Sequence, residues 1–317
     1  LADNQAIFAN TNHLYVISFN VKIDLSATSG GNNTYYSCGR SLVNRPSAGE
    51  ALFNESLLDL NDDGFYEERD TACGDLPYIE HTKTLSKLVQ TGPRNFQVSY
   101  NIVVVNKGGK ADNYALADRP AFDNDISILG ARYNTDAPSH PANPGSINLA
   151  GTGPWNLSSG QNINPGAVHT YTIQVEVSIN LEDGKGDNRY DQCGRAQSSY
   201  PVSNEGLFNE SQLDISSDGT VDQKDTACAD VPYIVHEKFT QNVIDRGNGD
   251  YGVIYKIDVK NLGGASGRYN LVDAPGFDND FVIQSANYTS NAIGNIGNPN
   301  PVNLIGSGPW TLATNQN

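Results

Sequence analysis

The sequence of 317 residues lacks the features that mark several common classes of protein. It has no methionine and no run of about eighteen apolar residues, so no segment is expected to cross a bilayer as a helix. Lysine and arginine number 20 against 36 acidic residues, and the formal charge of −16 argues against nucleic acid or an anionic membrane as partner. GxSxG, HExxH and phosphate-binding motifs are missing, and no carboxylate pair stands in a recognisable catalytic context. The sequence therefore predicts that the protein is not an enzyme.

Cysteine is scarce, and its spacing is informative. The four cysteines fall into two pairs, Cys38 with Cys73 and Cys193 with Cys228, each separated by 35 residues. An even count with one pair in each half predicts two disulfides, and hence an oxidising, extracellular compartment. Free buried thiols are the alternative. A zinc site is disfavoured because the sequence has no CxxC motif and no histidine pair near the cysteines.

Helical periodicity is also missing, whereas alternation with a period of two is clear. In residues 169–181, six apolar residues from Tyr171 to Leu181 alternate with polar ones, and residues 13–25 repeat this pattern. One apolar face with period two predicts a half-buried antiparallel strand in each segment. Several such strands separated by turn residues predict an all-β protein built from immunoglobulin-like β-sandwiches.

The whole chain is an internal repeat. The segment 207–215, "LFNESQLDI", is similar to 52–60, "LFNESLLDL", and the segment 255–264, "YKIDVKNLGG", is similar to 100–109, "YNIVVVNKGG". The offset between similar segments is 155 or 156 residues throughout. We expect modules of about 155 residues. Their predicted boundaries make residues 82–236 one complete module, residues 1–81 the C-terminal half of a module, and residues 237–317 the N-terminal half of the next. Since Leu1 is not an initiator methionine, a mature or excised piece is expected.

These spaced motifs resemble a known family of bacterial cell-surface repeats. "YNIVVVNKGGKADNYALAD", the strand "HTYTIQVEVSI", "LFN" and the "DTAC" segments are similar to the tandem repeats catalogued as domain of unknown function eleven. The resemblance covers the whole chain. It implies tandem β-sandwich modules in secreted or surface-anchored proteins that act as stalks, adhesins or fibres, and it brings no catalytic residues.

An acidic loop recurs in both copies and matches a twelve-residue calcium loop. The predicted ligands of the first copy are Asp59, Asn61, Asp63, Phe65, Glu67 and Asp70, with Phe65 contributing its backbone carbonyl. Those of the second copy are Asp214, Ser216, Asp218, Thr220, Asp222 and Asp225. In each copy a glycine, Gly64 or Gly219, occupies the position of the sharp turn. Calcium is thus the expected cofactor, and a solvated acidic turn is the alternative.

Surface fibre modules sometimes carry a crosslink between lysine and asparagine beside an acid. Lys83 and Lys238 open the first strand of consecutive modules, and Asn106 and Asn261 end the strand that follows. The sequence thus allows a Lys83–Asn106 and a Lys238–Asn261 isopeptide bond.

Together these features predict a structural repeat of an extracellular fibre or surface stalk. Its partners are copies of itself, joined head to tail when half-modules complete one another, either as separate subunits or within one continuous tandem array, which is the version favoured. The alternative is an adhesin module that recognises a glycan or protein ligand. Trp155 and Trp310 could then belong to a sugar platform, but packing in the core or between modules is the favoured role for both. Nearly identical repeats favour the structural role.

Overall fold

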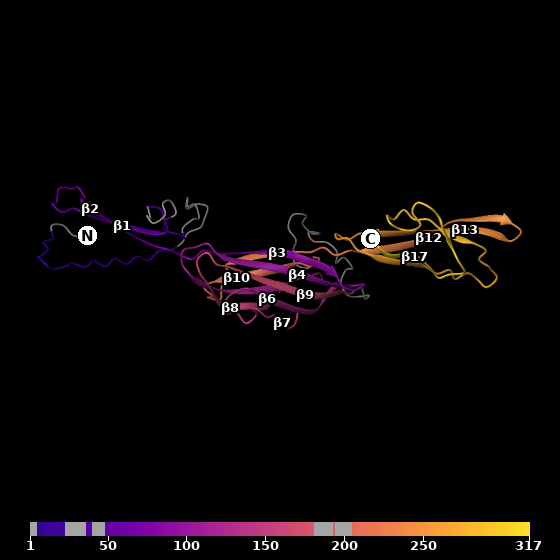
Figure 1. Ribbon diagram of the computed structural model, residues 1–317, viewed down its shortest axis with the longest axis horizontal. Helices are drawn as coiled ribbons and strands as arrows, with labels where there is room; N and C mark the ends of the chain where they lie inside the picture. The colour runs from indigo at the N-terminus through magenta and orange to yellow at the C-terminus, as the bar shows by residue number, and fades with distance from the viewer. Residues whose placement is uncertain (1–4, 23–35, 40–47, 181–192, 194–204) are drawn as a thin grey trace.

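The computed structural model describes residues 5–22, 36–39, 48–180, 193 and 205–317. Seventeen β-strands, β1 to β17, are the elements of these described residues. Figure 1 shows them following one long axis, with β1 and β2 towards one end, a layered central part, and β12, β13 and β17 towards the other end.

The central part consists of two antiparallel sheets. A five-stranded sheet has the order β3–β4–β9–β6–β7, and a four-stranded sheet has the order β11–β10–β5–β8. The first sheet contains β3 (Ile79–Gln90), β4 (Asn95–Asn106), β9 (Val168–Ile179), β6 (Ile126–Thr135) and β7 (Ile147–Leu149). The second contains β11 (Gln223–Ala227), β10 (Asn209–Ile215), β5 (Asp112–Pro120) and β8 (Trp155–Ile163). The predicted all-β, immunoglobulin-like sandwich is confirmed.

Alternate residues of the strands build the core between the two sheets. On β4, Tyr100 and Ile102 are fully buried, as are Val98 and Val104 two positions further out on either side. Leu213 of β10, in the other sheet, joins the same core cluster. The period-two pattern of the sequence therefore places one face of each strand in the core, because successive side chains of a strand point to opposite sides.

The strands outside the sandwich form four separate pairs. These are β1 (Leu52–Leu58) with β2 (Glu68–Gly74), β12 (Ile234–Gly247) with β13 (Asp250–Asn261), β14 (Tyr269–Asp273) with β17 (Trp310–Gln316), and β15 (Ala286–Tyr288) with β16 (Val302–Leu304). Many of their apolar side chains are exposed.

The repeat relates each flanking pair to a pair inside the sandwich. With an offset of 155 residues, β1 and β2 correspond to β10 and β11, β12 and β13 to β3 and β4, and β14 and β17 to β5 and β8. In the sandwich, β10 lies between β11 and β5. Among the described residues, β1 pairs with β2 alone, and β14 pairs with β17 alone. The flanking pairs thus have the sequences of sandwich strands but lack part of the sandwich neighbours.

The strand predicted over residues 13–25 is wrong for this chain. Residues 13–22 contain no strand, and Tyr15, Ile17 and Phe19 are exposed; residues 23–25 lie outside the described residues. The equivalent strand β9 lies between β4 and β6 and pairs with both. Since no such neighbours flank residues 13–22 in the described ranges, the alternating sequence has no edge to pair with.

The part of the chain that the structure describes contains no helix long and apolar enough to cross a membrane.

Candidate functional site

The first acidic loop, between β1 and β2, is closed by its own carboxylates. Asp59 accepts hydrogen bonds from the backbone N–H groups of Asp62 at 2.7 Å and Gly64 at 2.8 Å. Glu67 accepts one from Leu60 N–H at 2.7 Å, across the mouth of the loop. Gly64 has φ +85°, a left-handed conformation that glycine adopts without strain. The loop is thus wrapped around the side chain of Asp59.

Three predicted ligands of this loop lie together. Ligand oxygens of Asp59, Asp63 and Glu67 are all within 4.8 Å of one another, so this group could hold a metal ion. Desolvation raises the pKa of Asp59, but hydrogen bonds from Gly64, Asn61 and other backbone N–H groups outweigh it, and the net pKa is lowered. A lowered carboxyl pKa keeps the group ionised at neutral pH, which suits a cation ligand.

The other predicted ligands of the first loop are arranged differently. Asn61 accepts a hydrogen bond from Asp63 N–H at 3.3 Å, and Phe65 is exposed. Asp70 lies on β2 opposite Ser56, and its carboxylate accepts the N–H of Thr71 at 2.9 Å. Asp70 is not part of the three-residue group, so the twelfth position of the predicted loop belongs to the strand.

The second loop, between β10 and β11, shares some of the backbone hydrogen bonds of the first but has a different side-chain arrangement. Asp214 accepts the N–H groups of Asp218 and Gly219, Asp218 accepts that of Thr220, and Asp222 accepts that of Ile215 at 2.7 Å. Ser216 donates instead to Asp112 on β5, at 3.0 Å. Within the described ranges, no second group of three clustered metal-ligating side chains occurs.

Asp225, the twelfth predicted ligand of the second loop, joins the two sheets. Its carboxylate accepts the N–H of Lys83 on β3 at 2.6 Å and the N–H of Thr226 at 2.8 Å. It thereby fixes the backbone of Lys83 against the last strand of the sandwich.

Lys83 belongs to a buried polar cluster that the sequence did not predict. Its side chain and that of Asp118 are fully buried and form an ion pair through Asp118 Oδ1. Asn209 is also fully buried, and its Nδ2 donates to the other oxygen, Asp118 Oδ2, at 2.9 Å. Asn209 Oδ1 has no hydrogen-bond partner. One carboxylate therefore holds an amine and a carboxamide side by side in the core.

An aromatic ring lies against the lysine of this cluster. Tyr100 is fully buried, its ring centroid lies 5.3 Å from Lys83 Nζ, and its hydroxyl donates to the backbone oxygen of Leu207. Burial lowers the pKa of Lys83, although Asp118 opposes this effect. Burial, with a smaller contribution from Asp118, raises the pKa of Tyr100 well above its usual value.

The two predicted lysine–asparagine pairs are not brought together. Lys83 pairs with Ile102 in the β3–β4 register, whereas Asn106 lies at the end of β4 and donates to the backbone oxygens of Lys110 and Ile163. In the second copy, Asn261 lies four residues beyond the position that pairs with Lys238. Its side chain donates to the backbone oxygen of Ala265 at 2.8 Å.

Lys238 instead repeats the contact of Lys83. It forms an ion pair with Asp273 on β14, and its Nζ lies 4.8 Å from the centroid of Tyr255. Here the side chains are 36% and 19% exposed, compared with 0% for Lys83 and Asp118. The exposure differs because, among the described strands, β14 has no neighbour of the kind that β10 provides for β5.

Asp118 and Asn209 were thus missed at the sequence level, although a signal was present. Both recur at the repeat offset, Asp118 as Asp273 and Asn209 as Asn54 in the "LFNES" motif. Polar residues that recur inside otherwise apolar strands were the available sign of a buried polar contact.

Disulfides join Cys38 to Cys73 and Cys193 to Cys228, the pairs expected from the spacing. Both close loops with a sequence separation of 35 residues. In the second pair, the backbone N–H of Cys193 also donates to Asp230 at 2.6 Å. Each bond ties the segment that follows an acidic loop to a segment earlier in the chain.

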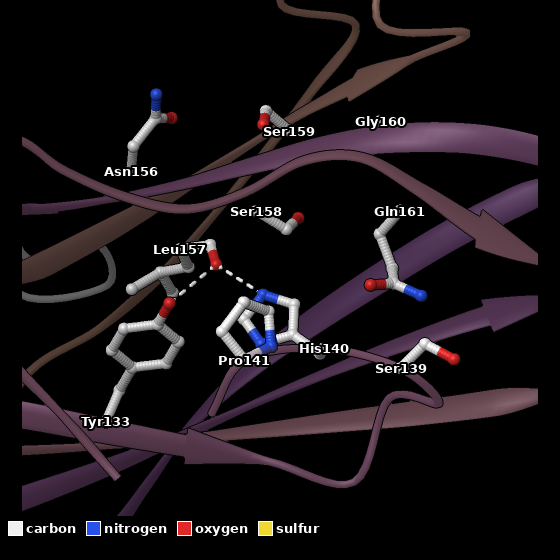
Figure 2. A pocket seen from close by; sticks show the side chains of 10 residues that line it. All are labelled: Tyr133, Ser139, His140, Pro141, Asn156, Leu157, Ser158, Ser159, Gly160 and Gln161. Carbon is white, nitrogen blue, oxygen red and sulfur yellow. Dashed lines mark hydrogen bonds between the residues drawn. The ribbon is translucent and has the colours of Figure 1, made fainter. Parts of the chain in front are cut away.

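An open depression on the sandwich lies beside Tyr133 and His140. Figure 2 shows both rings turned towards the backbone oxygen of Leu157, which each of them reaches at 2.9 Å. Ser139 and Gln161 lie at its rim. Because the two ring groups are used to hold a loop, the depression gives no specific support to a glycan or peptide ligand.

Comparisons with known proteins assign no family to the chain. No family model and no curated protein matches the chain. Among solved structures, the collagen adhesin of S. aureus matches at 9% identity and a TM-score of 0.23, over 62% of this chain and 57% of that one. The major pilin subunit of Bacillus cereus matches at 10% identity and a TM-score of 0.27, over 79% and 73%. A variant of that pilin matches at 10% and 0.28, over 80% and 74%.

The chain matches these surface adhesin and pilin structures only at low identity and low structural similarity. It matches little more than half the length of the adhesin. The resemblance to the family of surface repeats noted in the sequence stays a hypothesis, because no family model matches.

Proposed function

We propose that the protein is a structural repeat of an extracellular fibre or surface stalk, in which copies join head to tail by completing one another's half-modules. The division into residues 1–81, 82–236 and 237–317 is part of this proposal. The observation that carries it is the presence, at both ends, of strand pairs whose equivalents are buried in the central sandwich.

The missing neighbours are complementary. The β1–β2 pair corresponds to β10–β11, and β14 corresponds to β5. In the part of the chain that the structure describes, β1 has no neighbour of the β5 type and β14 has none of the β10 type. When β1 of one copy lies beside β14 of another, each strand gains the neighbour that its equivalent has in the sandwich. An unpaired edge of this kind readily accepts a strand from another chain.

The apolar faces are complementary as well. Leu213 in the sandwich is 0% exposed, whereas the equivalent Leu58 on β1 is 54% exposed. Tyr100 is 0% exposed, and the equivalent Tyr255 on β13 is 42% exposed. Completing the sandwich would bury these faces, with roughly 25 cal/mol gained for each Å² of apolar surface removed from water.

Such a contact generates a filament. The surface at the N-terminal end differs from the surface at the C-terminal end, so the contact is head-to-tail and does not close on itself. The same contact forms whether the next copy is a separate subunit or part of one longer tandem chain. The two disulfides suit an oxidising, extracellular location.

We expect the purified chain to associate as its concentration rises, in sedimentation velocity experiments. Electron micrographs should then show thin filaments with an axial repeat of about 80–100 Å, given two sandwiches per copy and strands that rise about 3.3 Å per residue. A compact monomer at high concentration, with both terminal regions protected from protease, would contradict the proposal. A denaturing gel of native material in reductant distinguishes separate subunits from one long chain.

Calcium is proposed as the ion of the acidic loops, where it would act as a structural clip. The supporting observation is the group of carboxylates formed by Asp59, Asp63 and Glu67. Oxygen-only ligands on a short loop suit calcium. The ion would stabilise the conformation in which the β1–β2 pair contacts the next copy.

Chelation is therefore expected to speed protease cleavage between β1 and β2, and calcium should bind with a dissociation constant on the order of 10⁻⁵–10⁻³ M. Asp59→Ala should remove one site in isothermal titration. Glu68→Ala is the matched control, since it removes one exposed carboxylate outside the group. Cleavage at the same rate with and without chelator would contradict the assignment of calcium to the acidic loop.

A further inference from the structure

We infer that Lys83 and Asn209 are joined by an isopeptide bond that forms in the buried cluster around Asp118. The three side chains come from three strands of the two facing sheets: Lys83 from β3, Asp118 from β5 and Asn209 from β10. The bond therefore links β3 of the five-stranded sheet to β10 of the four-stranded sheet.

The arrangement brings the reacting groups together on one carboxylate. Lys83 Nζ contacts Asp118 Oδ1, and Asn209 Nδ2 lies 2.9 Å from Asp118 Oδ2. Asp225 fixes the backbone of Lys83 through a hydrogen bond of 2.6 Å. The amine and the carboxamide are thus held as neighbours, and no further motion of the chain is needed to bring them to the same acid.

The cluster also differs from an ordinary structural ion pair. Asn209 Oδ1 is buried without a hydrogen-bond partner, which a folded protein normally avoids. The side chain of Lys83 is fully buried and contacts the same carboxylate as Asn209. Both features fit a pair of groups that react with each other better than a pair that merely packs.

The reaction balances without an oxidant or any other reactant. Asp118 takes one proton from the Lys83 ammonium, and the neutral amine attacks the side-chain carbonyl carbon of Asn209. A bond forms between Lys83 Nζ and Asn209 Cγ. A second proton passes from Nζ through Asp118 to Nδ2, the bond between Cγ and Nδ2 breaks, and ammonia leaves. The products are a secondary amide and ammonia, with Asp118 acting as the proton carrier.

The second copy of the cluster indicates that the same bond forms between copies. This inference rests on the proposed head-to-tail contact. Lys238 and Asp273 are already paired, and the asparagine equivalent to Asn209 is Asn54, which is exposed on β1. In the sandwich, Asn209 lies opposite Pro120 and Ser211 opposite Asp118. When β1 of another copy takes the place of β10, the same register sets Asn54 beside the Lys238–Asp273 pair. Each contact along the filament then becomes covalent.

The intact mass of the purified, reduced and denatured chain tests the bond within one copy. It should be about 17 Da below the sequence mass, the loss of one ammonia. Trypsin should fail to cleave after Lys83, and a branched peptide joining Lys83 to Asn209 should appear. Lys83→Arg, Asp118→Asn and Asn209→Ala should each restore the full mass. The full sequence mass for the folded wild-type chain, with cleavage after Lys83, would overturn the inference whether or not the variants fold.

Assembled material tests the bond between copies. After boiling in detergent and reductant, filaments should leave a ladder of covalent multimers that Asn54→Ala and Lys238→Arg abolish. Filaments that dissolve completely into single chains would overturn the crosslink between copies while leaving the proposed function intact. Failure to form filaments at all would instead contradict the proposed function, and the mass of the single chain would still decide the bond between Lys83 and Asn209.

Discussion

Replacing Leu213 with alanine is expected to lower the free energy of unfolding of the sandwich by about 2–5 kcal/mol, whereas Leu58→Ala should change it by less than about 0.5 kcal/mol. The two leucines occupy the same position of the repeat, on β10 and β1. Leu213 is fully buried and Leu58 is more than half exposed. Alanine leaves a cavity at the first position and only shortens an exposed side chain at the second.

The same pair should behave differently in assembled material. In the proposed filament Leu58 would take the place that Leu213 has in the sandwich, so Leu58→Ala should lose buried contacts only on association. A loss of about 2–5 kcal/mol corresponds to association weaker by roughly 30-fold or more. Denaturant titration of dilute protein, followed by the fluorescence of the buried Trp155, measures the first effect. Sedimentation at high concentration measures the second.

Two outcomes would contradict this account. Equal destabilisation by both substitutions in dilute protein would mean that β1 is already packed within its own chain. Unchanged association of the Leu58→Ala variant would mean that β1 does not enter a neighbouring sandwich.

The sequence predicted the fold class because the relevant signals are local. Alternation along residues 169–181 requires only that one face of the strand be buried, and β9 shows that burial pattern. The pairing of Cys193 with Cys228 followed from an even count and a recurring spacing. Neither inference needed knowledge of which strands lie side by side.

The buried cluster could not be predicted in the same way. Lys83, Asp118 and Asn209 lie far apart in sequence, and only the order and facing of the two sheets bring them together. Choosing Asn106 as the partner of Lys83 relied on neighbouring strands, but in that hairpin the two residues are four positions out of register. Residues 13–22 show the converse limit, because a strand-like pattern forms no strand without a neighbour.

A charged substitution on either terminal strand pair is expected to abolish association, because the proposed contact joins the N-terminal region of one copy to the C-terminal region of another. Leu58→Asp would put a charge on the exposed face of β1 that is proposed to enter the next sandwich, and Tyr255→Asp would put one on the face of β13 that is proposed to receive it. An unpaired charge in a core is strongly unfavourable. Leu58→Asp and Tyr255→Asp should therefore each prevent self-association. Leu129→Asp, on an exposed position of the complete sandwich, is the matched control and should leave association unchanged.

Mixing these two variants tests the head-to-tail contact most directly. Leu58→Asp retains a working C-terminal end, and Tyr255→Asp retains a working N-terminal end. In sedimentation velocity, each variant alone should remain monomeric, and an equimolar mixture should form a one-to-one dimer and nothing longer, because both outer ends of that dimer are blocked. A mixture that stays monomeric, or either variant forming filaments alone, would contradict the completion of one half-module by another.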